Sequence, residues 1–288
     1  MIAIYTPTYN RKQELKRLYE SLCNQTNKNF FWLIIDDGST DETHDIVKEW
    51  INENTIDIRY EKKENGGKHT ALNLALKIVD SYWNICVDSD DYLISEDVIY
   101  KLNEDIEKYS TSKDIVSIVY PYQFKNQYVK KISRKEQLVK KYDLRSKKLN
   151  VREISILSRP YTYKDISFPI FKEENFISEG AIEIPKLLKG NRVYIHEPII
   201  EGDYLQDGLS KNIIRIWAKN PKGYYYVRNL QIQLYLKRKM YLQVIKPAGQ
   251  ILAYNLFKKT NIFKGTNYHL IVLLSFPFGI LYWLKKFR

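Results

Sequence analysis

The chain has 288 residues, 44% hydrophobic and 28% charged, which excludes wholesale disorder and allows a substantial core. Its net charge is +12, yet residues 211 to 288 contain 15 Lys and Arg and no Asp or Glu, so residues 1 to 210 carry about −3. The positive charge is therefore concentrated in the C-terminal part. It predicts an anionic partner there: lipid headgroups, a polyanionic substrate or nucleic acid.

Apolar strand-like runs alternate with helical patterns through the first 110 residues. The runs cover residues 2–6, 30–35, 56–60 and 82–87, and an amphipathic stripe typical of a helix follows each one. Strands this apolar are typical of a parallel sheet covered by helices on both faces. The sequence therefore predicts an α/β fold in which the four strand-to-helix turns meet at one edge of the sheet.

The second half of the chain has a weaker pattern. Residues 115–122, 164–171 and 192–200 are predicted to be strands. Residues 125–152 are polar and have no clear period, which predicts an insertion or lid. Residues 204–210 are predicted to be a polar turn that closes the site.

The turn after the fourth run is acidic, with Asp88, Ser89, Asp90 and Asp91 in succession. On an extended chain Asp88 and Asp90 point the same way, so the two carboxylates can share one Mg²⁺ or Mn²⁺ ion. An acidic turn that caps a helix is the alternative interpretation of these residues, because D-x-D is also common by chance.

The other turns are suited to a nucleotide. Asp36 or Asp37 can accept hydrogen bonds from ribose hydroxyls or a base N–H, although helix capping explains the same residues. Gly66 and Gly67 allow a close backbone approach at a helix start, where Lys68 can meet phosphate. The sequence has neither a P-loop motif nor G-x-G-x-x-G, which argues against P-loop kinases and common dinucleotide dehydrogenases.

Taken together, the turns resemble those of family-2 glycosyltransferases with the GT-A fold. The matching segments are Thr6-Pro7-Thr8-Tyr9-Asn10-Arg11, Asp36-Asp37-Gly38-Ser39-Thr40-Asp41, Asn65-Gly66-Gly67-Lys68 with Ala71 and Asn73, and Asp88-Ser89-Asp90-Asp91. The resemblance implies a Rossmann-like, mostly parallel central sheet with helices on both faces. It also implies a nucleotide-diphosphate sugar as donor, for which we expect a UDP-sugar, and inversion of the anomeric centre.

The resemblance also assigns roles to individual residues. The implied donor-binding residues are Pro7, Thr8, Tyr9, Asp36, Asp37, Gly67, Lys68, Asp88 and Ser89. Asp88 and Asp90 would hold a divalent cation, Mn²⁺ or Mg²⁺, on the diphosphate, with Asp90 as the direct ligand.

An inverting transfer needs a general base to take the proton of the acceptor hydroxyl. The family supplies an acid from a motif ahead of a helix in the second half of the chain. Glu179 occupies that place in Ser178-Glu179-Gly180, although the common family form is Glu-Asp. Asp165, Glu173 and Glu174 are the alternatives.

The chain is expected to divide into a GT-A domain, residues 1–210, and a basic aromatic helical tail, residues 211–288. Within the domain, residues 1–110 would bind the nucleotide sugar and residues 111–210 the acceptor.

Residues 270–284 of the tail are mostly apolar but fall short of the roughly 20 residues that span a bilayer. They predict a shallow insertion with Tyr282 and Trp283 at the headgroups. The alternative is a helix pair that packs on the domain.

The predicted protein is a metal-dependent glycosyltransferase that extends a glycan or lipid-linked acceptor in surface polysaccharide or lipopolysaccharide synthesis. Residues 1–5 enter a strand pattern without a basic leader, which predicts a cytoplasmic protein. With the basic tail, this predicts a peripheral position on the cytoplasmic face of an anionic membrane, and no nucleic-acid partner is expected.

Two other functions compete with this prediction. A nucleotidyltransferase that makes nucleotide sugars would usually carry a glycine-rich basic loop after the first strand, and Thr6 to Arg11 contains no glycine. A nucleic-acid-binding protein would use the basic tail but would leave the acidic turns unexplained.

Overall fold

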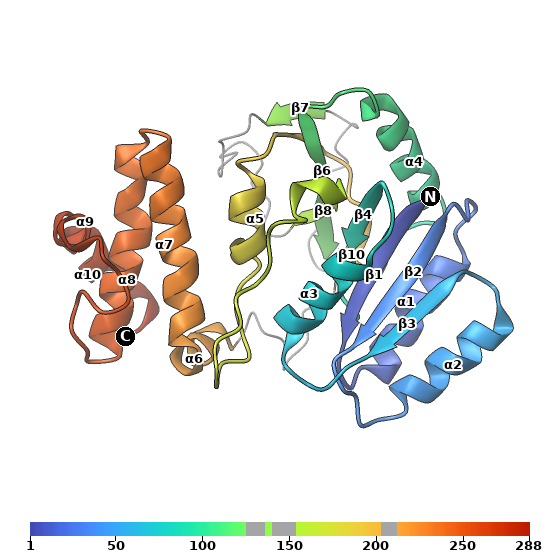
Figure 1. Ribbon diagram of the computed structural model, residues 1–288, viewed down its shortest axis with the longest axis horizontal. Coiled ribbons are helices and arrows are strands. Elements are labelled where there is room, and N and C mark those ends of the chain that lie inside the picture. Colours follow the sequence, from blue (N-terminus) through green and yellow to red (C-terminus); the bar gives the residue numbers. More distant parts are fainter. Residues whose placement is uncertain (125–135, 140–153, 203–211) are drawn as a thin grey trace. The chain divides into compact units, whose positions relative to one another are not determined.

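A computed structural model describes residues 1–124, 136–139, 154–202 and 212–288 (Figure 1). The predicted polar turn at 204–210 lies outside the described residues, as does the predicted insertion at 125–152 except for one short strand. Contacts divide the chain into two compact units, one formed by Met1–Ile166 and Lys186–Leu205, the other by Ser167–Pro185 and Gln206–Arg288.

The first unit is built on a mixed sheet. Its strands are β1 (Ile2–Thr8), β2 (Phe30–Asp36), β3 (Ile58–Lys62), β4 (Trp83–Cys86), β5 (Asp91–Leu93), β6 (Ile115–Phe124), β7 (Glu136–Val139), β8 (Ile154–Ser158), β9 (Asn191–Ile195) and β10 (Ile200–Gly202). The order is β3-β2-β1-β4-β8-β6-β10-β5, and β9 lies between β6 and β7. Strands β3, β2, β1 and β4 are mutually parallel, and β8 is antiparallel to β4 and β6. The predicted α/β fold with a mostly parallel centre is confirmed.

Helices cover both faces of this sheet because the strands are apolar on both sides. The helices of the unit are α1 (Lys12–Cys23), α2 (Thr43–Glu53), α3 (Lys68–Ile78) and α4 (Val98–Tyr109). Ile4 and Trp32 belong to the large core that α1, α2 and α4 complete. Ala3 and Phe31 point to the opposite face, where Ala71 of α3 packs. This period of two fixes the register of the strands.

The prediction of a strand at residues 164–171 was wrong. That segment follows a short 3₁₀ turn, η1 (Pro160–Thr162), and has no strand structure. Tyr163 and Phe168 are nevertheless buried, and the hydroxyl of Tyr163 meets the amide of Asn84. The apolar pattern of this segment therefore reflects burial without strand structure. The strand that does follow the insertion is β8, which was not predicted.

The second unit is helical. It contains α5 (Gly180–Lys186), α6 (Ile213–Lys219), α7 (Pro221–Lys237), η2 (Tyr241–Val244), α8 (Ile245–Phe257), α9 (His269–Leu274) and α10 (Phe276–Lys286). The last residue of α5, Lys186, is assigned to the first unit. Its core is aromatic: the rings of Tyr224 and Tyr254 stack at 4.4 Å, and the Tyr225 hydroxyl donates to Asn255 at 2.6 Å. No helix among the described residues is long and apolar enough to cross a membrane.

The units divide the chain differently from the two domains expected from the sequence. Residues Ser167–Pro185 pack with the helical tail, whereas the expected boundary placed them in the GT-A domain. Asn220 explains this, since its side-chain oxygen accepts hydrogen bonds from the backbone N–H groups of Asn175 and Phe176. Glu174 in turn accepts from two N–H groups in the first turn of α7.

Candidate active site

The polar turns that follow β1, β2 and β4 lie at one edge of the sheet. The register pairs Thr8 with Asp36 at the ends of β1 and β2. Beyond it, the N–H of Asp37 donates to the carbonyl of Thr8 at 2.8 Å. On the other side of β1, the N–H of Val87 donates to the carbonyl of Tyr5 at 3.1 Å. In open α/β sheets the carboxyl ends of the strands are where ligands bind.

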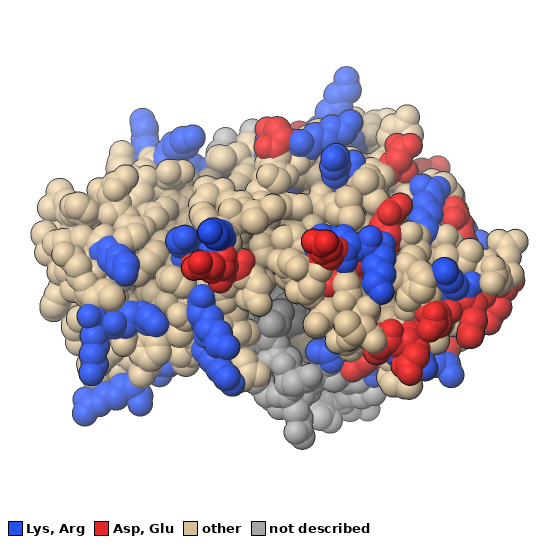
Figure 2. Space-filling model, turned by 60° about the horizontal axis from the view of Figure 1, so that its bottom comes forward, with Lys and Arg blue, Asp and Glu red and all other residues tan. Residues whose placement is uncertain are grey.

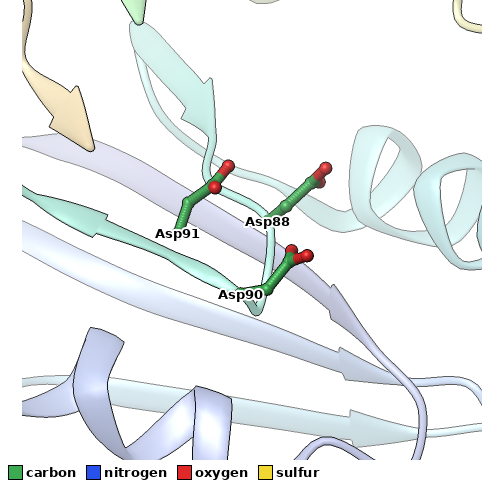
Figure 3. A group of neighbouring side chains, drawn as sticks. All are labelled: Asp88, Asp90 and Asp91. Atoms are coloured by element: carbon green, nitrogen blue, oxygen red, sulfur yellow. The ribbon is translucent and has the colours of Figure 1, made fainter. Parts of the chain in front are cut away.

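Three carboxylates converge in the turn between β4 and β5 (Figure 3). Asp88, Asp90 and Asp91 each offer one oxygen, and these oxygens all lie within 4.8 Å of one another. The turn closes through a hydrogen bond of 3.1 Å from the N–H of Asp91 to the carbonyl of Asp88. Three oxygens this close form a ligand set that suits a hard divalent cation.

Burial and the neighbouring negative charges make Asp90 and Asp91 hard to ionise. Burial, followed by the charges of Asp88 and Asp90, raises the pKa of Asp91 to about 8. Burial and then Asp88 also raise the pKa of Asp90. A bound cation would offset this repulsion, so the residues present fit a divalent metal ion.

The raised pKa of Asp91 predicts a pH-dependent stability in the absence of metal. The unfolded chain loses this proton near pH 4 and the folded chain only near 8, so the stabilisation is complete at acid pH and is lost as the pH rises through about 8. We therefore expect the free energy of unfolding in EDTA to fall by about 2 kcal/mol or more over that interval. Urea denaturation of wild type and Asp91→Asn at several pH values measures this fall. If the free energy of unfolding changes equally with pH in the two proteins, the raised pKa does not belong to Asp91.

Lys68 brings a positive charge to the acidic turn. It is the first residue of α3, and its Nζ lies 2.7 Å from Oδ2 of Asp88. The preceding Gly67 has φ of 91°, a conformation that favours glycine. Arg17 supports the turn from α1 by donating to the carbonyl of Asp90 at 2.5 Å. A diphosphate at this edge would thus meet a lysine beside the carboxylates.

Both carboxylates at the end of β2, Asp36 and Asp37, are engaged within the fold. Asp36 is fully buried and accepts from the N–H of Ser39 at 2.7 Å and from the Tyr60 hydroxyl at 2.6 Å. Asp37, also buried, accepts from Lys63 Nζ at 2.6 Å and from the N–H groups of Gly66 and Gly67 at 3.0 and 2.7 Å. The contact of Asp36 and Asp37 with the donor stays a prediction. The hydrogen bonds within the protein are enough to explain why a carboxylate occupies each position.

Asp37 therefore offers a decisive substitution. Asp37→Asn puts an amide where a carboxylate accepts from two backbone N–H groups and a lysine, so we expect the free energy of unfolding to fall by about 2 to 3 kcal/mol. Chemical denaturation measures this change. The matched control is Asp57→Asn, an exposed carboxylate 3.5 Å from Arg59, which should cost less than about 1 kcal/mol. Unchanged stability of Asp37→Asn would show that Asp37 is kept for the ligand alone.

The other predicted donor-binding residues lie at the end of β1 and in the acidic turn. Pro7 is buried in β1, while Tyr9 just beyond it is exposed and can stack on a base. Thr8 is buried, and its hydroxyl has no hydrogen-bond partner among the residues that the structure describes. Ser89, which lies between Asp88 and Asp90 in the sequence, is buried.

Glu179 belongs to the helical unit, directly before α5. Its carbonyl accepts from the N–H groups of Ile182 and Glu183, both at 3.0 Å, and its side chain is exposed. Two of the alternatives have other partners: Asp165 pairs with Lys189 at 2.6 Å, and Glu174 accepts from the N–H groups of Lys222 and Gly223. The third, Glu173, is exposed.

Asp91 is the site residue that the sequence did not assign. It begins β5, which is antiparallel to β10, and this places it opposite Gly202. A Cβ on Gly202 would lie 2.9 Å from Oδ1 of Asp91, so the glycine leaves room for the carboxylate. The sequence does show a third acid directly after the D-x-D pair. The direction of its side chain, however, depends on the pairing of β5 with β10, a strand more than 100 residues away.

The chain is similar to known proteins in sequence and in fold. Residues 3–172 match the sequence model of a family described as Glycosyl transferase family 2. Chondroitin synthase of Pasteurella multocida (strain Pm70) is 35% identical over 104 residues, which are 36% of this chain and 11% of that protein. The chain therefore spans only a small part of that relative.

Two solved structures share the fold. S. aureus TarS 1-349 in complex with UDP-GlcNAc has a TM-score of 0.61 at 16% identity, covering 98% of this chain and 89% of that chain. The mannosyltransferase PcManGT from Pyrobaculum calidifontis, in complex with GDP-Man and Mn²⁺, has a TM-score of 0.55 at 14% identity, covering 97% and 86%. At these identities the likeness establishes the fold.

Proposed function

Because the chain belongs to glycosyl transferase family 2, we propose that it moves a sugar from a UDP-sugar to a hydroxyl of a glycan or lipid-linked acceptor, inverting the anomeric centre. The observation that carries this proposal is the group of three carboxylates beside Lys68, at the edge where the strand-end turns meet. The UDP-GlcNAc bound to TarS supports the choice of UDP, and the chondroitin synthase supports a glycan acceptor.

Asp88, Asp90 and Asp91 would hold a Mn²⁺ or Mg²⁺ ion. When bound, the cation supplies Lewis-acid stabilisation of the negative charge that develops on the departing diphosphate. Lys68 adds a positive charge at the same edge, and Arg17 holds the backbone of Asp90 in place. The exposed ring of Tyr9 would stack on the base.

Glu179 would act as the general base. The acceptor oxygen forms a bond to the anomeric carbon while the bond from that carbon to the diphosphate oxygen breaks. The acceptor hydroxyl proton passes to the Glu179 carboxylate, which lies at the start of a helix where a negative charge is favourable.

We also propose that the acceptor belongs to surface polysaccharide or lipopolysaccharide synthesis and is reached from the cytoplasmic face of a membrane. The basic charge of residues 212–288 supports this location, because lipid-linked acceptors lie on anionic membranes.

The test is the stereochemistry of transfer. The protein is incubated with α-linked UDP-sugars and Mn²⁺, and proton NMR follows the anomeric signal of the product or, without an acceptor, of the slowly released sugar. We expect a β-linked product from one UDP-sugar. An α-linked product would contradict the inverting mechanism, and turnover of GDP-sugars alone would contradict the choice of donor.

A further inference from the structure

Helices α9 and α10 pack on α8 through small residues. Val272, Ser275 and Gly279 are buried and recur every three or four residues, so they form one face of the helix pair. A Cβ on Gly279 would lie 2.2 Å from Cδ2 of Leu252 and 3.1 Å from the carbonyl oxygen of Gly249, so the glycine permits this close approach of the two helices. Beyond α10, Phe287 stacks on Phe257 of α8 at 4.9 Å and fixes the end of the chain.

The opposite face of the same helices is apolar and exposed. At 100° per residue, Leu270 and Leu274 point away from the buried Val272 within α9, and Leu281 points away from Gly279 within α10. The exposed apolar residues are Leu270, Leu273, Leu274, Phe276, Leu281 and Leu284, each 42% to 69% exposed. We call them the leucine face. A soluble helix normally turns its large apolar residues inward and its small or polar ones outward, and here the order is reversed.

Positive charge surrounds this face. The exposed side chains of Lys285, Lys286 and Arg288 follow it directly. Residues 212–288 contain no Asp or Glu, and in Figure 2 blue side chains lie over the leftmost part of the view, where α8 to α10 lie, without red ones among them.

We propose that the leucine face rests on an anionic membrane, with its side chains among the upper acyl chains and Lys285, Lys286 and Arg288 at the headgroups. Exposed leucines next to lysines, on a helix lying in the plane of the interface, are the features by which amphipathic helices bind lipid. A second copy of the chain would bring the same positive charge against itself with no acidic partner in residues 212–288, so charge complementarity favours lipid.

The two aromatic residues expected at the headgroups are less exposed than the leucine face. Tyr282 and Trp283 were predicted to sit at the headgroups, yet both are only partly exposed. Tyr282 lies among other rings of the unit, at 6.0 Å from Phe278 and 6.1 Å from Phe287. The leucines carry the exposed apolar surface in their place.

Flotation of the full chain with vesicles tests this proposal independently of sugar transfer. With vesicles of phosphatidylcholine and phosphatidylglycerol we expect wild type to float, and with phosphatidylcholine alone to float far less. Leu274→Ser/Leu281→Ser should lower the partition coefficient about tenfold or more. Lys285→Gln/Lys286→Gln should lower it about tenfold, and only for the anionic vesicles at low salt.

A matched control is Tyr82→Ser/Tyr100→Ser, which removes apolar residues that are 90% and 53% exposed in the other unit and should leave flotation unchanged. All the replaced side chains are exposed, so thermal melts should show every variant folded. Wild-type flotation of the leucine variant would overturn the proposal. A second result would also overturn it: wild type sediments as a dimer, and the leucine variant sediments as a monomer while its flotation is unchanged. The face would then join two copies of the chain.

Discussion

Replacing Asp90 by Asn is expected to lower sugar transfer at least about a hundredfold and to remove Mn²⁺-dependent binding of the nucleotide donor. Asp90 is one of three carboxylates whose oxygens lie within 4.8 Å, and Asp88 already shares its charge with Lys68. Loss of the Asp90 charge therefore leaves too little negative charge to hold a divalent cation. Release of UDP measures transfer, and calorimetric titration of UDP with and without Mn²⁺ measures binding.

Stability separates this loss of function from misfolding. The pKa of Asp90 is raised by burial and by Asp88, so the amide should leave the metal-free protein at least as stable as wild type at neutral pH. Asp57→Asn, an exposed change of the same chemistry next to β3, should keep full activity. If Asp90→Asn binds UDP with the Mn²⁺ dependence of wild type, the metal site lies elsewhere.

Replacing Glu179 by Gln should lower transfer by about 10² to 10⁴ while donor affinity stays within about twofold. The amide keeps the size of the side chain but cannot accept the acceptor proton. Single-turnover transfer and equilibrium binding of UDP measure the two quantities separately. The pattern of retained binding with lost transfer distinguishes a base from a donor ligand.

Substitution of a neighbouring acid tests whether Glu179 is the correct residue for the base. Glu173→Gln changes an exposed acid six residues away in the same unit. Asp165 lies 2.6 Å from Lys189, and Glu174 accepts hydrogen bonds of 2.8 Å from two N–H groups of α7, so both acids are engaged within the fold. Near-wild-type transfer by Glu179→Gln together with loss in Glu173→Gln would move the base to Glu173.

The parallel half of the sheet could be predicted because its information is local. Runs such as Phe30 to Ile35 are apolar on both faces, and a helical stripe follows each one, which leaves few other architectures. The position of the acidic turn follows from the same reasoning, since Asp88 comes two residues after the end of β4.

Long-range pairing explains what the sequence did not reveal. Strand β8 joins the sheet antiparallel between β4 and β6, across the predicted insertion. The direction of Asp91 depends on β10, and the burial of Asp36 depends on the Tyr60 hydroxyl from β3. Each of these contacts joins residues that are distant in the chain, so no local pattern contains it.

The aromatic residues of the tail show the same limit. The tail was expected to be a basic aromatic helical segment, and Tyr224, Tyr225 and Tyr254 are buried in the core of the helical unit. Composition does not say which side of a helix packs. The leucine face is exposed because the opposite face of α10, with Gly279, packs against α8, and this packing depends on contacts outside the local sequence.

The measurement that tests the central claim most directly is a thermal-shift comparison of UDP, GDP, CDP and TDP, each with and without Mn²⁺. A ligand that binds only the folded state stabilises it by about 2.7 kcal/mol at a hundredfold excess over its Kd. We predict that UDP raises the Tm when Mn²⁺ is present and has little effect without it. If no nucleoside diphosphate raises the Tm of the folded protein under either condition, the turns around Asp88, Asp90 and Asp91 do not form a donor site.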